Sequence, residues 1–96
     1  MLLTHIGFEE DRHLARQLDP AWGVDLIIGG HSHTLPEHAV EENGVGIAQA
    51  GTGTDQSGRF DSIVDTDNNC TDSYTWRTVP ICAETCPRIP AMEQVL

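Results

Sequence analysis

The stretch that decides the fold is Val24-Asp25-Leu26-Ile27-Ile28-Gly29-Gly30-His31-Ser32-His33-Thr34. Its first five residues form a short apolar run rich in β-formers, which predicts a strand buried on both faces beneath helices. Two glycines end the run and let the backbone turn tightly and approach other groups closely. In open α/β sheets, ligands bind outside the carboxyl ends of strands. The two histidines that follow therefore stand where a functional site is expected.

The residues before this stretch predict the first half of a βαβ unit. Residues 1–6 are expected to form a short apolar strand and residues 9–18 a helix. Acidic side chains in the first turn of this helix oppose the positive end of its dipole, and Leu14, Ala15 and Leu18 form a narrow apolar stripe. A strand, a helix and a second strand in this order indicate a βαβ unit.

The later half of the chain predicts antiparallel strands. The pair Asn43-Gly44 is a strong hairpin signal, and residues 45–50 follow as a strand. Alternation of apolar and polar residues predicts two further strands over residues 59–64 and 74–81. Residues 91–96 resemble the first turns of a helix. The fold class is therefore mixed α/β (α+β), with a βαβ unit followed by antiparallel strands.

The composition excludes several classes of function. The 96 residues carry 15 acidic side chains and five arginines but no lysine, for a formal net charge of −10. Without a basic patch, nucleic-acid binding is not expected. No long uncharged apolar stretch is present, so no membrane span is expected, and the first residues lack the regions of a signal peptide. A chain of this length makes at most one small domain with a thin core.

The three cysteines give a weak signal. Cys70, Cys82 and Cys86 cannot all pair with one another. The spacing of the last two is not that of a redox CxxC motif, and no second Cys/His pair nearby completes a zinc site. Ordinary buried or loop cysteines are the favoured interpretation. A Cys82–Cys86 disulfide, or pairing outside this segment, stays open as an alternative.

Three histidines follow the two strands of the predicted βαβ unit. His5 comes after the first strand, and His31 and His33 come after the second. If the two strands are parallel neighbours, their ends lie side by side and the three imidazoles converge. Neutral imidazole nitrogens are common ligands of transition metals. The pattern predicts a metal site, and the alternative is that these are ordinary strand-end histidines.

Two other groups of residues are not expected to bind metal. Asp11-Arg12-His13 is formally an Asp-x-His motif, but it lies inside the predicted helix, where positions i and i+2 point in different directions. Solvent-exposed helix residues are the expected interpretation. His38 lies in a polar stretch with Glu37, Glu41 and Glu42, which indicates a solvated loop.

Several blocks of sequence together resemble a known family. Gly30-His31-Ser32-His33 looks like the closing Gly-His-x-His block of the calcineurin-like metallophosphoesterase superfamily, and Leu3-Thr4-His5-Ile6-Gly7 resembles its preceding block. Within that superfamily, the stretch is most similar to the 5′-nucleotidase / UDP-sugar hydrolase branch. Asn43-Gly44-Val45, Gln49-Ala50-Gly51, Gly58-Arg59-Phe60-Asp61 and Trp76-Arg77-Thr78-Val79-Pro80-Ile81 also match that branch, so the resemblance covers nearly the whole chain.

The resemblance implies a fold and a chemistry. The fold would be part of a four-layer metallophosphoesterase sandwich, and the enzyme a metal-dependent phosphoric ester hydrolase acting on nucleotides or other phosphate esters. Two divalent metal ions in the complete domain (Mn, Zn, Co or Fe) would activate a water. His5 and His31 would bind one ion and His33 the other. The resemblance implies no catalytic side chain in this chain and leaves the substrate-binding residues unknown.

The chain also departs from the family pattern. The family's earlier Asp-x-His, Gly-Asp and Gly-Asn-His blocks do not precede His5, because only four residues do. Residues 1–86 would thus be the C-terminal half of a catalytic domain and residues 87–96 the start of an inter-domain helix. The missing N-terminal half and a C-terminal nucleotide-binding domain are expected partners. Family resemblance suggests a periplasmic, cell-surface or extracellular protein. The isolated chain is expected to be inactive, and the alternative is a non-catalytic metal-binding remnant.

Overall fold

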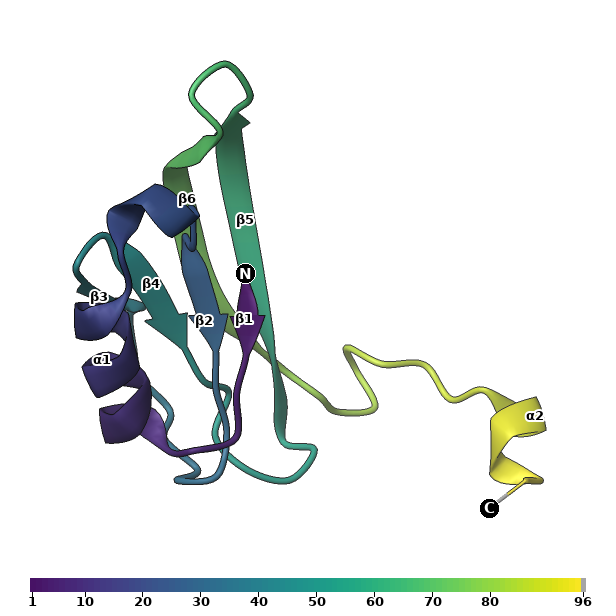
Figure 1. Cartoon of the computed structure of the whole chain (residues 1–96). Coiled ribbons are helices and arrows are strands. Elements are labelled where there is room, and N and C mark those ends of the chain that lie inside the picture. Colours follow the sequence, from purple (N-terminus) through teal and green to yellow (C-terminus); the bar gives the residue numbers. More distant parts are fainter. Residues whose placement is uncertain (96) are drawn as a thin grey trace.

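The computed structural model describes residues 1–95, which form two sheets and two α-helices (Figure 1). In chain order the elements are β1 (Leu2–Leu3), α1 (Phe8–Gln17), the 3-10 turn η1 (Pro20–Trp22), β2 (Leu26–Ile28), β3 (Val40–Glu42), β4 (Val45–Ala48), β5 (Gln56–Asp65), β6 (Cys70–Pro80) and α2 (Pro90–Glu93). This arrangement confirms the mixed α/β class.

The first sheet has four strands in the order β1-β2-β4-β3. Strands β1 and β4 both run parallel to β2, and β3 runs antiparallel to β4. Their arrowheads show that β1, β2 and β4 end at the same edge of the sheet (Figure 1). Because β1 and β2 are parallel neighbours joined by α1, the predicted βαβ unit is confirmed.

The core lies between this sheet and α1. Ile27 from β2 and Ile47 from β4 are fully buried, and they pack with Val45 and with Ala15 from the helix. The predicted apolar stripe is confirmed, because Leu14 and Leu18 also pack against this cluster. Side chains alternate along a strand, so Val45 and Ile47 share the face that meets α1.

The predicted hairpin at Asn43-Gly44 joins β3 to β4. Both residues have positive φ, 53° and 74°, as a two-residue type I′ turn requires. The side-chain amide of Asn43 also donates hydrogen bonds to the carbonyls of Ala15, at 3.1 Å, and Leu18, at 2.9 Å. One asparagine therefore shapes the turn and binds two carbonyls at the C-terminal end of α1, where regular helical hydrogen bonds run out.

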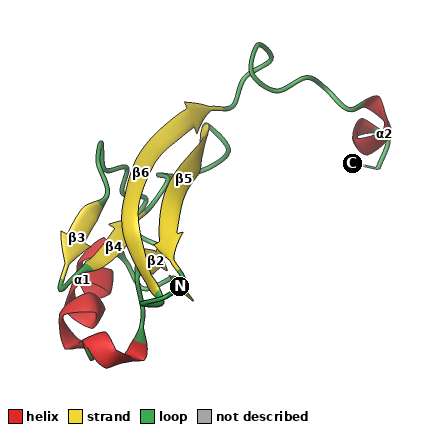
Figure 2. Ribbon diagram, turned by 90° about the horizontal axis from the view of Figure 1, so that it is seen from above, coloured by secondary structure: helices red, strands yellow, loops and turns green. Residues whose placement is uncertain are grey.

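The second sheet is a long antiparallel hairpin of β5 and β6, which lies on the opposite side of the first sheet from α1 (Figures 1 and 2). The Phe60 and Tyr74 rings stack with their centroids 4.7 Å apart. A Cβ placed on Gly46 of β4 would lie 3.5 Å from the Tyr74 ring, so this ring packs on the sheet. The backbone amide of Thr71 donates to the Asp25 carboxylate at 3.3 Å.

The structure corrects several predicted bounds. Strand β1 covers only Leu2–Leu3 of the expected residues 1–6, while β5 and β6 are longer than expected. Strand β3 was not predicted. Helix α2 lies apart from both sheets (Figure 1) and begins at Pro90, and Leu96, which the sequence assigns to that helix, lies outside the described residues. The division into residues 1–86 and 87–96 stays a prediction.

Candidate metal site

Two of the three predicted ligands lie side by side at the edge where β1 and β2 end. The ring centroids of His5 and His31 are 5.3 Å apart, and the ring planes meet at 72°. Leu3 pairs with Ile28 in the sheet, and the Thr4 amide donates to the Ile28 carbonyl at 3.0 Å. The parallel register therefore carries both histidines to the same edge, as the sequence predicts.

Gly30 makes room for the His5 ring. A Cβ added to Gly30 would lie 2.8 Å from Nδ1 of His5, closer than real Cβ contacts allow. Glycine at this position thus permits a close approach between the loop after β2 and the imidazole after β1. Neutral imidazole nitrogens bind divalent transition metals, so the donor chemistry of His5 and His31 fits a metal site at this edge.

His33 lies in the same loop as His31 but does not join the pair formed by His5 and His31. Both residues have left-handed backbones, with φ of 79° for His31 and 56° for His33, and all three imidazoles are exposed. Within residues 1–95, no three His, Cys, Asp or Glu side chains gather closely enough to hold a metal ion. The structure thus brings two of the proposed ligands together, and the ligand set His5, His31 and His33 stays a prediction.

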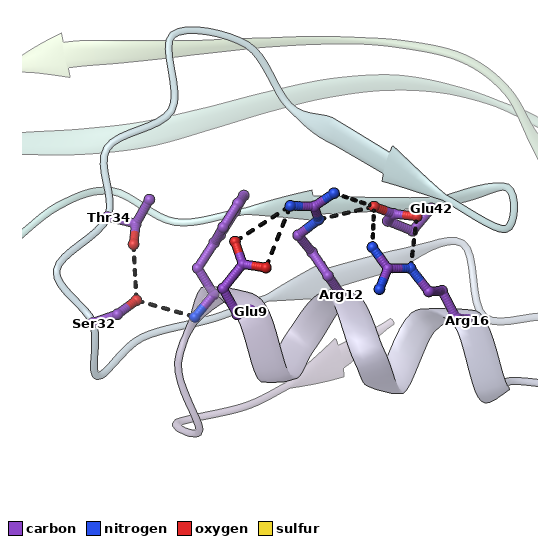
Figure 3. Close-up of polar contacts among 7 residues, drawn as sticks. Glu9, Arg12, Arg16, Ser32, Thr34 and Glu42 are labelled. Carbon is purple, nitrogen blue, oxygen red and sulfur yellow. Dashed lines mark hydrogen bonds and ion pairs between the residues drawn. The ribbon is translucent and has the colours of Figure 1, made fainter.

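Ser32 lies between those two histidines and makes a full set of hydrogen bonds. Its hydroxyl oxygen accepts from the Phe8 amide at 3.0 Å and from the Thr34 hydroxyl at 2.8 Å (Figure 3). Its proton goes to Oε1 of Gln49 at 3.1 Å. Neither Ser32 nor Gln49 was predicted to have a role at this site. Their sequence signals are their positions in two of the blocks that carry the family resemblance. Ser32 lies within Gly30-His31-Ser32-His33, and Gln49 opens Gln49-Ala50-Gly51 after a strand of the same sheet.

Asp11 corrects the prediction that the Asp11-Arg12-His13 motif is solvent-exposed. Asp11 is fully buried, and neither carboxylate oxygen has a hydrogen-bond partner among the described residues. A Cβ on Gly29 would overlap this carboxylate. Asp11 stands four residues before buried Ala15 and so shares the inner face of α1. His13 is exposed, as predicted, because position i+2 points elsewhere.

Arg12 also departs from that prediction, because it is half-buried in an ion-pair cluster. Arg12 and Arg16 both donate to the Glu42 carboxylate, with N–O distances of 2.7 to 3.1 Å, and Arg12 also meets Glu9 at 3.3 Å (Figure 3). These hydrogen bonds, first from Arg16 and then from Arg12, lower the pKa of Glu42 to about 2. The cluster joins β3 to α1.

The remaining polar residues of interest lie in loops or at strand ends. His38 is exposed in a loop, as predicted. Cys70, Cys82 and Cys86 are free and exposed, so the alternative disulfide between the last two is not formed in this structure. A hydrogen bond with Thr85 lowers the pKa of the Cys82 thiol.

No helix within residues 1–95 is long and apolar enough to cross a membrane.

Comparison with known proteins gives one partial similarity. The trifunctional nucleotide phosphoesterase protein YfkN of Bacillus subtilis (strain 168) is 58% identical over 33 residues, which make up 34% of this chain. The chain spans about 2% of the length of this curated relative. No protein-family model matches the chain, and no solved structure matches it. The chain thus has partial similarity to a nucleotide phosphoesterase.

Proposed function

We propose that this chain supplies part of the metal site of a phosphohydrolase that cleaves nucleotide phosphate esters. The observation that carries this proposal is the pair of imidazoles, His5 and His31, 5.3 Å apart at the ends of parallel neighbouring strands. Strand ends of this kind are where α/β sheets bind ligands. The partial identity with a nucleotide phosphoesterase supports the same reaction class.

The proposed ligands divide between two divalent ions. His5 and His31 hold one ion and His33 holds the other, and manganese, zinc, cobalt and iron all suit imidazole. When bound, such a pair of ions supplies an activated water and clamps the phosphate. The residues of this chain bind and orient the ions through exposed imidazoles, and Gly30 provides the space for the His5 ring.

The chain by itself lacks the negative charge that a pair of dications needs. Two dications about 4 Å apart repel strongly, and carboxylates that bridge them offset the repulsion. Asp11 does not fill this role, because among residues 1–95 its carboxylate forms no three-ligand group with the histidines. We therefore expect the isolated chain to hold about one ion and to hydrolyse nothing.

Metal uptake tests the ligand assignment. The chain is equilibrated with Mn²⁺, Co²⁺ or Zn²⁺, separated from free metal and subjected to elemental analysis. The expected result is about one ion per chain, lost in His31→Ala and retained in His38→Ala. His38 is a matched control, because it is an exposed loop histidine outside the proposed site. Equal uptake by both variants would refute the assignment.

Hydrolysis of AMP and p-nitrophenyl phosphate tests whether the isolated chain is inactive. The chain should show no turnover with any of these metals. Metal-dependent turnover that His31→Ala abolishes would overturn the expected inactivity. The coding DNA on the 5′ side of the Met1 codon should encode Asp-x-His and Gly-Asn-His blocks, and their absence there would count against a complete phosphohydrolase.

A non-catalytic metal-binding remnant of the same family is the second candidate. It is favoured by the lack of any three-ligand cluster within residues 1–95. It predicts that the chain takes up metal. It also predicts that neither the chain nor the product of its complete reading frame hydrolyses a phosphate ester, alone or mixed together. Hydrolysis by that complete product would exclude it.

A further inference from the structure

A buried glutamine holds the loop that carries His31 and His33. Gln49 follows β4 and is only 2% exposed. Its Oε1 atom accepts two hydrogen bonds from this loop, one from the Ser32 hydroxyl at 3.1 Å and one from the backbone amide of Thr34. A single acceptor directly after β4 thus binds the residues on both sides of His33.

Ser32 extends this attachment to the helix. Its oxygen accepts from the backbone amide of Phe8, the first residue of α1 (Figure 3). A hydroxyl has one proton and two lone pairs, and here the proton goes to Gln49 while Phe8 and Thr34 fill the lone pairs. The turn between the two histidines is therefore attached both to α1 and to the end of β4.

The backbone of this turn needs such support. His31 and His33 flank Ser32, and both have left-handed φ, of 79° and 56°. Non-glycine residues seldom adopt this conformation, which costs free energy and persists only where surrounding contacts impose it. The contacts here are those of Gln49 and the Ser32 side chain, together with two backbone hydrogen bonds. The Gly51 amide donates to the Thr34 carbonyl at 2.9 Å, and the Ser32 amide donates across His31 to the Gly30 carbonyl at 3.1 Å.

Filling space does not explain this glutamine. Its Nε2 is buried and has no hydrogen-bond partner among the described residues, and an unpartnered buried amide group is costly. An apolar side chain of the same length would fill the same volume without that cost. Gln49 therefore stabilises the fold through its acceptor oxygen, which accepts the hydrogen bonds from the loop.

We propose that Gln49 is a positioning residue, which fixes the left-handed turn at His31-Ser32-His33 and so presents both imidazoles for metal binding. The metal-binding half of this inference rests on the proposed function. The hydrogen bonds that hold the turn do not depend on the proposed function, so the attachment of the turn and its role in metal binding can be tested separately.

The test compares Gln49→Met with Gln49→Glu in the full chain. Methionine keeps the length of the side chain and lacks the acceptor, whereas glutamate keeps an acceptor oxygen. Hydrogen exchange followed by NMR is read at the Thr34 amide, with the Gly46 amide, which donates to Asp25, as an unaffected reference. In Gln49→Met, exchange at Thr34 should rise about tenfold, as expected for the loss of one net hydrogen bond. Gln49→Glu should restore most of the protection.

Metal affinity is measured on the same variants with Co²⁺, whose visible spectrum reports on its ligands. The affinity should fall about tenfold in Gln49→Met, which changes the positions of the imidazoles and adds no charge, and it should recover in Gln49→Glu, which restores the acceptor. Ser32→Ala, at an exposed position, gives a further variant if Gln49→Met does not fold, and it should speed exchange at Phe8 and weaken Co²⁺ binding.

The outcomes separate the two proposals. Unchanged exchange at Thr34 in Gln49→Met would refute the attachment of the loop by Gln49. Faster exchange with unchanged Co²⁺ affinity would refute the positioning role while leaving the metal site intact. If the unmodified chain takes up no Co²⁺, the proposed function fails and the positioning role fails with it, whatever the exchange experiment shows of the hydrogen bonds.

Discussion

The four-stranded sheet and the β5–β6 hairpin are stabilised by different kinds of contact. The strands of the sheet have two to four residues each, yet the sheet contains every buried apolar strand residue. The hairpin strands have 10 and 11 residues, and none of those residues is fully buried. Packing against α1 therefore stabilises these short strands, whereas the hairpin depends on its own ladder, on one aromatic cluster and on a few contacts with the sheet, such as those of Tyr74 with Gly46 and Glu41.

The largest expected contrast is between two isoleucines. Ile47 is fully buried in β4, and Ile63 is 65% exposed in β5. Ile47→Ala removes packed methyl groups and leaves a cavity, so it should lower the free energy of unfolding by about 2–5 kcal/mol. Ile63→Ala should change it by less than about 0.5 kcal/mol. Urea denaturation measures both, and equal losses would contradict a core confined to the sheet.

Adding a methyl group at two glycines sharpens the same contrast. Gly29→Ala would push a Cβ into the buried carboxylate of Asp11, whereas Gly58→Ala would meet the Trp76 ring in the hairpin. Gly29→Ala should cost about 1–3 kcal/mol of unfolding free energy, and Gly58→Ala should cost less because the ring can shift.

Asp11→Ala provides the check on that interpretation. If the Asp11 carboxylate is the obstacle, the double variant Gly29→Ala/Asp11→Ala should recover part of the lost stability, with a coupling of about 0.5–3 kcal/mol. Strict additivity of the two substitutions in urea denaturation would show that Gly29 is constrained by something else.

The smallest effect concerns acid sensitivity. The pKa of Glu42 is lowered to about 2 by Arg16 and Arg12 on α1, and the pKa of Asp61 is lowered by Arg59 on its own strand. A lowered folded-state pKa stabilises the fold above the ordinary pKa, and that stability is lost as pH falls through the folded-state value. Stability should therefore fall between about pH 5 and pH 2 less steeply in Glu42→Gln than in the unmodified chain.

Asp61→Asn is the matched control for the loss of stability at low pH. Asp61 and Arg59 are two residues apart, so their attraction persists in part when the hairpin unfolds. Urea midpoints measured at a series of pH values should change less in Asp61→Asn than in Glu42→Gln. An equal change in the two variants would mean that the Glu42 cluster does not join β3 to α1 in solution.

The sequence predicted those features that depend on local chemistry. The Asn43-Gly44 turn followed from its two residues, and the βαβ unit followed from the order of apolar runs. The adjacency of His5 and His31 followed in turn, because parallel neighbouring strands end at one edge. Each of these needs only short-range pattern and one rule of topology.

The features that the sequence did not reveal depend on tertiary neighbours. The burial of Asp11 requires the space that Gly29 leaves in the loop after β2, in addition to its place on the inner face of α1. The role of Gln49 depends on Ser32 and Thr34, which become its neighbours only after β4 pairs with β2. The left-handed backbone of His33 has no local cause in its sequence, so it could not be predicted from propensity.

The most direct test of the central claim follows the imidazole NMR signals of all five histidines while the chain is titrated with Mn²⁺, which broadens nearby resonances. We predict that His5, His31 and His33 broaden at low metal concentration, and that His13 on α1 and His38 in its loop do not. Equal broadening of all five signals, or broadening of His13 and His38 first, would contradict a metal site at the ends of β1 and β2.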